Sequence, residues 1–206
     1  MLSGGPHAPA PPLAPAELMP ASLPIRAATL TVAYGETEDR LTLVAADAGG
    51  RGVHAALTRR LTERVVNGLA GLLERSSAVA VQAPAEMRDD IILMEHQGAL
   101  YGRGVDKGAD TGAGGNPAAP DGDAAGAAPA DLPPPLLLTA VDVTVTPATF
   151  EIRMRAGATP LIALSVDRLG AHRIVETLGQ RAEAAGWHIA LDAAWLDPGH
   201  TEIVLN

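Results

Sequence analysis

Alternating apolar and polar residues predict three strands near the start of the chain. Leu30, Val32 and Tyr34 alternate with small or polar residues, and the same period of two recurs over 41–45 and 53–57. Such alternation is typical of strands with one buried face. Because short polar turns separate the three segments, we expect an antiparallel meander.

A helix should follow the third strand. Thr58 stands where an N-cap is expected, with a hydroxyl able to accept a hydrogen bond from an amide of the first turn. Apolar residues then recur at helical spacing on one face. They are Leu61, Val65, Leu69, Leu72 and Leu73. Residues 78–81 could form a short further strand.

A second helix is predicted from Ala85 to about Leu100, after Pro84. Met87, Ile91 and Met94 follow the spacing i, i+4, i+7, which predicts that these three side chains face the core. The charged residues between them are then expected to face solvent. They are Glu86, Arg88, Asp89, Asp90 and Glu95.

The same order of elements is predicted in the second half of the chain. Period-two alternation covers 141–145, 150–154 and 162–166, and Asp167 is a second N-cap candidate. A helical stripe follows and ends at Gly186. Alternation over 187–191 and apolar residues over 203–205 predict two C-terminal strands.

An offset of 109 residues aligns the two halves without a gap across about thirty residues, so that Thr58 falls on Asp167. Identities are too few to show common ancestry. The predicted fold is α+β, with two pseudo-repeated β-meander-plus-helix (βββα) units. Because each unit alone has a thin core, we expect them to share one mostly antiparallel sheet with both helices on one face. Two tethered units, or edge pairing between chains, are the alternatives.

Two segments are predicted to be disordered because they lack residues able to form a core. Residues 1–23 form an Ala/Pro-rich tail, and 102–134 form a linker of Gly, Ala, Asp and Pro. The predicted organisation is therefore a tail, a first βββα unit with the extra helix over 24–101, the linker, and a second unit with C-terminal strands over 135–206.

Composition narrows the classes of function. The net charge of −9 and the small number of aromatic residues (one Phe, two Tyr and two Trp) disfavour a single-stranded nucleic-acid binder. Without cysteine the chain has no disulfide or thiolate site. No stretch approaches the ~18–20 apolar residues of a membrane span, and no signal peptide is evident, so a cytoplasmic location is expected. The Ala-, Gly- and Arg-rich usage indicates a bacterial, GC-rich coding sequence.

The ionisable residues offer one weak candidate for a metal or acid–base site. Asp89 and His96 stand seven residues apart on the predicted 85–100 helix, and a carboxylate and an imidazole there could bind a metal or exchange protons. A solvated charged face explains the same residues without chemistry. We expect the six histidines to lie at the surface or at sheet edges, and the sequence points to no cofactor.

One face of the first predicted sheet is small and mildly apolar. It would carry Thr31, Thr42, Val44, Ala46, His54 and Ala56. We expect it to pack on the 85–100 helix or on a second subunit. The chain is therefore interpreted as a non-enzymatic protein-interaction or assembly module, with a homodimer as its simplest form. The alternative functions are a small-ligand or metal-binding protein, or an enzyme using the 85–100 helix, and a single-stranded nucleic-acid binder.

Overall fold

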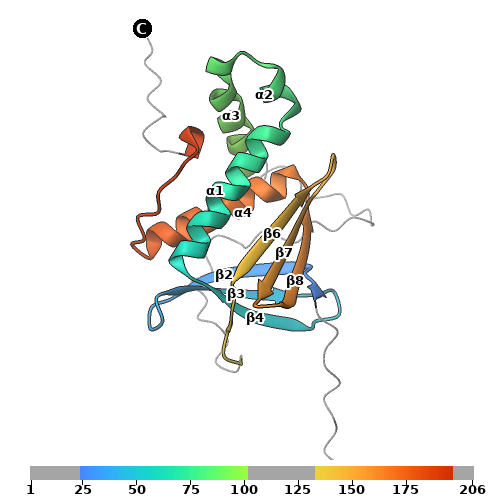
Figure 1. The fold of residues 1–206 in the computed structure, drawn as a ribbon, viewed down its shortest axis with the longest axis vertical. Coiled ribbons are helices and arrows are strands. Elements are labelled where there is room, and N and C mark those ends of the chain that lie inside the picture. Colours follow the sequence, from blue (N-terminus) through green and yellow to red (C-terminus); the bar gives the residue numbers. More distant parts are fainter. Residues whose placement is uncertain (1–23, 102–132, 197–206) are drawn as a thin grey trace, which may run out of the picture.

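The computed structural model describes residues 24–101 and 133–196 (Figure 1). Within these ranges the fold is mixed α+β, with eight strands in two four-stranded sheets and four α-helices. The predicted tail, nearly all of the predicted linker and the predicted strand at 203–205 lie outside the described residues. No helix in the described ranges is both long and apolar enough to cross a bilayer.

The first sheet is built around the meander predicted from the N-terminal pattern. It contains β2 (Thr29–Gly35), β3 (Arg40–Ala46) and β4 (Gly52–Leu57), all antiparallel, with Leu43 opposite both Val32 and Ala55. The short strand β5 (Leu136–Leu137), from the other half of the chain, adds parallel to β4. The inward residues of β3 are almost completely buried, as their alternation predicts.

The second sheet is built in the same way. It contains β6 (Ala140–Val145), β7 (Phe150–Ala156) and β8 (Thr159–Val166), again antiparallel. The short strand β1 (Ile25–Arg26), from the start of the described chain, pairs parallel with β8. Each half of the chain therefore contributes a two-residue strand to the sheet of the other half.

The prediction of one shared sheet is wrong. The order of strands is β1-β8-β7-β6 in one sheet and β2-β3-β4-β5 in the other, so the two meanders do not join edge to edge. Short parallel strands occupy the edges of β4 and β8 instead. The thin core of each unit is completed by packing, because apolar residues of both sheets and of the long helices form one buried cluster.

The two long helices begin at the predicted caps. The backbone amide of Leu61 donates to Thr58 Oγ1 (3.2 Å) at the start of α1 (Arg59–Ser76), and that of Gly170 donates to Asp167 Oδ1 (2.7 Å) at the start of α4 (Arg168–Ala184). The two helices cross one another on the same side of the first sheet (Figure 1). Their buried residues close the common core.

Two segments differ from the predicted secondary structure. The predicted strand at 78–81 is a helix, α2 (Ala78–Gln82), whose start is capped by the buried hydroxyl of Ser77. The predicted strand at 187–191 is irregular and leads to a 3-10 turn, η3 (Ala194–Leu196). Long-range contacts replace strand pairing there, because the indole of Trp187 donates to Asp39 Oδ1 (2.7 Å).

The predicted 85–100 helix forms with the opposite face buried. It consists of a 3-10 turn, η1 (Ala85–Met87), and α3 (Arg88–Tyr101). Met87 is 51% exposed and Met94 71% exposed, whereas Ile92, His96 and Ala99 are buried. The helix packs against α4, α1, α2 and η3 and does not cover the outer face of the first sheet. Its buried face makes polar contacts with α4.

Candidate functional site

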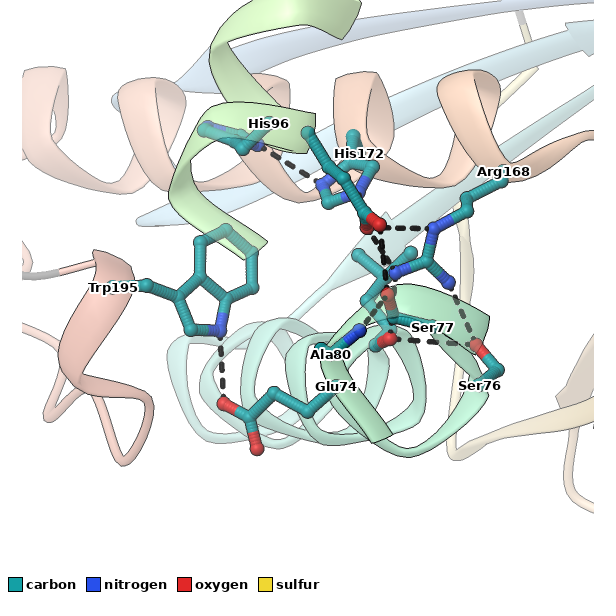
Figure 2. A network of polar contacts seen from close by, with 10 residues as sticks. Glu74, Ser76, Ser77, Ala80, His96, Arg168, His172 and Trp195 are labelled. Atoms are coloured by element: carbon teal, nitrogen blue, oxygen red, sulfur yellow. Dashed lines mark hydrogen bonds and ion pairs between the residues drawn. The ribbon is translucent and has the colours of Figure 1, made fainter. Parts of the chain in front are cut away.

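A network of polar side chains joins α3 to α4 and to the end of α1 (Figure 2). Glu95 and His96 come from α3, whereas Arg168, His172 and Glu176 come from α4. Trp195 of η3 closes one side. These six residues, named the α3–α4 network below, bring five ionisable side chains and one indole together.

Arg168 holds Glu95 against the end of α1. Its Nε donates to Glu95 Oε2 (2.9 Å), and its terminal nitrogens donate to Ser76 Oγ (2.9 Å) and to the carbonyl oxygen of Leu73 (2.7 Å). The second oxygen of Glu95 accepts from Ser77 Oγ (2.7 Å). One guanidinium thus donates both to a carboxylate and to a carbonyl in the last turn of α1.

Two imidazole rings meet at the centre of the network. The Nδ1 atoms of His96 and His172 lie 3.3 Å apart, and His96 Nε2 lies 3.0 Å from Glu176 Oε2. The exposed fractions are 6% for His96 and 0% for His172. Within the described ranges His172 Nε2 has no hydrogen-bond partner, and it lies 3.8 Å from Glu95 Oε2. Only one proton fits between the Nδ1 atoms, so one ring donates and the other accepts.

The network holds His172 neutral. Burial is the main cause, and the nearby charges of His96 and Arg168 add to it, so that the pKa of His172 falls to about 3. The pKa of Glu176 is lowered as well, chiefly because its carboxylate accepts a hydrogen bond from His96. The electrostatics therefore favour a carboxylate at Glu176 and an uncharged imidazole at His172.

Trp195 packs against both imidazole rings. Its ring centroid lies 5.1 Å from that of His96 and 5.7 Å from that of His172, in edge-on arrangements. The indole Nε1 donates to Glu74 Oε1 on α1 (2.8 Å). This contact brings η3 over the histidine pair and excludes water from it.

The geometry favours a structural role for this cluster. The carboxylate oxygens of Glu95 and Glu176 that face the histidines already accept hydrogen bonds. Among the described residues, no group of three or more His, Cys, Asp or Glu side chains is placed to hold a metal ion. What the network does is fasten the inner side of α3 to α4.

The structure separates the two residues of the predicted metal or acid–base site. Asp89 is exposed in the first turn of α3, whereas His96 is buried two turns later, against His172 and Glu176. The expectation that all histidines are superficial is wrong for His96 and His172. One signal was available in the sequence, because His172 and Glu176 stand four residues apart on one helix face.

The predicted interaction face lies on the outer side of the first sheet. Thr31 is exposed, Ala56 is fully buried, and the others are partly buried: Thr42, Val44, Ala46 and His54. His54 Nδ1 donates to the carbonyl oxygen of Pro133 (2.7 Å), just before β5. The chain entering β5 therefore crosses one end of this face.

Comparison with known proteins does not place the chain in a family. It matches no protein-family model, no curated protein and no solved structure. Its function is therefore inferred from its own residues.

Proposed function

We propose that this chain is a protein-interaction or assembly module, and that its contact surface is the outer side of α2, η1 and α3. The observation that carries the proposal is a group of four large apolar side chains left exposed there. They are Val79 (62% exposed), Val81 (56%), Met87 (51%) and Met94 (71%). Single exposed apolar residues are ordinary, but several in one short segment are typical of contact surfaces.

The α3–α4 network supports this assignment. It directs the polar residues Glu95 and His96 inward and thereby leaves the methionines of the same segment outward. Methionine side chains are flexible and polarisable, which suits surfaces that adapt to a partner. Covering them would be favourable by about 25 cal/mol per Å² of apolar surface.

The segment also lies where a partner could reach it. In Figure 1, α2 and α3 stand at the end of the molecule away from the first sheet, beyond the crossing of α1 and α4. A second copy of the chain is the simplest partner. The outer face of the first sheet, from Thr31 to Ala56, is a second candidate contact surface because of its small, mildly apolar residues.

We also infer that the two halves are pseudo-repeats of one βββα architecture. The two N-caps, Thr58 and Asp167, stand 109 residues apart and bind the same position of their helices. Three antiparallel strands precede each cap. The reciprocal exchange of β1 and β5 supports the same inference, since equivalent strands make equivalent parallel contacts.

The test is to place charges on the proposed surface. The double variant Met87→Glu/Met94→Glu should weaken self-association, or capture of a partner, by at least about 10-fold. Light scattering over a range of concentrations and pull-down with the purified chain as bait measure the two effects. The matched control, Thr37→Glu/Ala48→Glu, adds the same charge at exposed positions of the distant turns.

Two results would contradict the proposal. One is a strictly monomeric protein, by light scattering and crosslinking, that retains no partner. The other is association that survives the methionine variant but is lost when the control charges are introduced.

A further inference from the structure

We propose that the groove between α1 and the edge strand β6 binds an extended peptide segment of a partner protein, which adds a strand to the second sheet. This site is separate from the surface of α2 and α3. It combines a sheet edge with available hydrogen-bonding groups, an apolar wall and a cation, Arg64, that makes no ion pair within the described residues.

The first element of the site is the edge of β6. In the described chain β6 pairs only with β7, so its other edge has no strand beside it. Thr146 N donates to the carbonyl oxygen of Thr149 (2.8 Å) where the two strands turn, so Thr146 is a residue that hydrogen-bonds to β7. Along an antiparallel strand such residues alternate with residues whose N–H and C=O groups point away from the partner strand. Val141, Val143 and Val145 therefore direct their N–H and C=O groups to the open edge. Such an edge is a template for an additional strand.

The second element is the wall formed by α1. A groove of about 300 Å³ runs between the helix and residues 139–143 of the edge strand. Its helical side carries Leu61, Val65 and Leu72, with Gly68 between them. A strand added to β6 would direct every second side chain toward this apolar wall. Backbone pairing and side-chain pockets would then act together, as in other cases of strand addition.

The other half of the chain carries a side chain at the position where the α1 groove has Gly68. On α4, the residues Arg173, Ile174 and Thr177 stand 109 positions after Arg64, Val65 and Gly68 of α1. Thr177 stands where the first groove has Gly68, and a Cβ atom at Gly68 would meet nothing within 4 Å. The missing side chain thus helps to keep the α1 groove open.

The third element of the site is the charge of Arg64, which indicates what kind of peptide would bind. Arg64 lines the groove, is exposed, and makes no ion pair within the described residues. The other charged residue of the groove, Asp142, is already paired with Arg155 (2.8 Å). Among the residues that the structure describes, the groove therefore presents a positive charge that no ion pair compensates. It fits an extended segment that alternates apolar and polar residues and carries a carboxylate.

A second copy of the chain fits this edge less well. Pairing of β6 with the β6 of another copy would bring a second α1 to the same side of the joined sheet. Its Arg64 would then approach the first Arg64, and like charges disfavour that contact. A single peptide strand avoids this repulsion.

The test uses the full-length protein and a defined probe. The probe is a fluorescent seven-residue peptide that alternates Val and Thr, with one Glu at its centre. Fluorescence anisotropy should show saturable binding. N-methylation of alternate peptide amides should weaken it by at least about 10-fold, because it removes the donors that pair with β6.

Two protein variants locate the binding. Gly68→Thr introduces the residue found at the equivalent position of α4 and should weaken binding by about 10-fold, whereas Gly98→Thr, at an equally open helical position on α3, should not change it. Neither change is expected to unfold the protein, since Thr has a higher helix propensity than Gly. Arg64→Glu should reverse the preference, so that a peptide with Lys in place of Glu binds better.

Three results would overturn the proposal. One is the absence of saturable binding by any of these peptides, and another is binding that neither Gly68→Thr nor N-methylation weakens. The third is self-association that Gly68→Thr abolishes, which would identify a second copy as the occupant. Met87→Glu/Met94→Glu should leave peptide binding intact, so failure of this site and failure of the α2 and α3 surface are distinguishable.

Discussion

The Nδ1 atoms of His96 and His172 lie 3.3 Å apart in the buried contact between α3 and α4. The two histidines stand 76 positions apart in the chain, and their contact lies on the side of α3 that faces inward, with Ile92. If both rings carried a proton on Nδ1, the contact would become repulsive. Protonation of both rings would therefore weaken the contact between α3 and α4.

Acidification should destabilise the fold through His172. The pKa of this residue is about 3 in the folded protein and about 6.5 in an unfolded chain. The unfolded chain therefore takes up the proton first, and the free energy of unfolding should fall as the pH drops below 6.5. The slope can reach about 1.4 kcal/mol per pH unit for one such group. Urea unfolding at pH 7.5 and 5.5 measures it.

Two variants distinguish the contribution of His172 to the pH dependence of stability from that of other titrating groups. His172→Phe should be less stable than the wild type at pH 7.5 but should lose most of the dependence between pH 7.5 and 5.5. His188→Asn changes an exposed histidine and should keep the wild-type dependence. An unchanged slope in His172→Phe would contradict this explanation. The lowered pKa of Glu176 adds a loss of stability only at lower pH, below about 4.5.

Removing Arg168 should destabilise the protein because it leaves Glu95 without its main partner. Arg168→Ala is expected to lower the free energy of unfolding by about 2 kcal/mol, since both side chains are less than one-third exposed. Arg155→Ala, which breaks the exposed pair with Asp142, should cost less than about 1 kcal/mol. Denaturant titration measures the free energy of unfolding of both variants. Equal losses would show that Arg168 stabilises the protein no more than a residue of an exposed ion pair does.

The inward face of α3 can be tested by truncating one residue on each side. Ile92 is 1% exposed, so Ile92→Ala should cost about 3 kcal/mol through lost burial and a cavity. Met94 is 71% exposed, so Met94→Ala should change stability by no more than about 0.5 kcal/mol. Thermal and urea unfolding provide the values. A larger loss of stability in Met94→Ala than in Ile92→Ala would indicate that Met94 faces the core, as the sequence pattern predicts.

Asp39 should tolerate asparagine better than alanine. Its φ is +50°, in the left-handed region, and its Oδ1 accepts from Tyr34 Oη (2.8 Å) and Trp187 Nε1 (2.7 Å). Asn keeps both the acceptor and an acceptable backbone conformation, whereas Ala loses both. Melting temperatures should therefore follow the order wild type, Asp39→Asn, Asp39→Ala. Asp39→Ala should also change the fluorescence of Trp187, and unchanged emission would contradict this contact.

Much of the local structure follows from the amino-acid pattern. Period-two alternation placed β2, β3 and β7 within a residue or two of their observed bounds, and the caps Thr58 and Asp167 begin α1 and α4. These features depend on neighbours in the chain, which is why they can be inferred from it. The candidate site could not be inferred in the same way, because His96 finds its partners 76 and 80 residues away.

The sequence by itself determined which residues of each strand are buried and where the long helices begin. Only the tertiary structure decided that the strands form two sheets that exchange β1 and β5, and that α3 turns its methionines outward. The spacing of residues along a helix identifies two faces that could be buried. The face that becomes buried is the one whose contacts with neighbouring elements lower the free energy more. For α3 those surroundings are Arg168 and His172 of a distant helix, which bind Glu95 and His96 and leave Met87 and Met94 exposed.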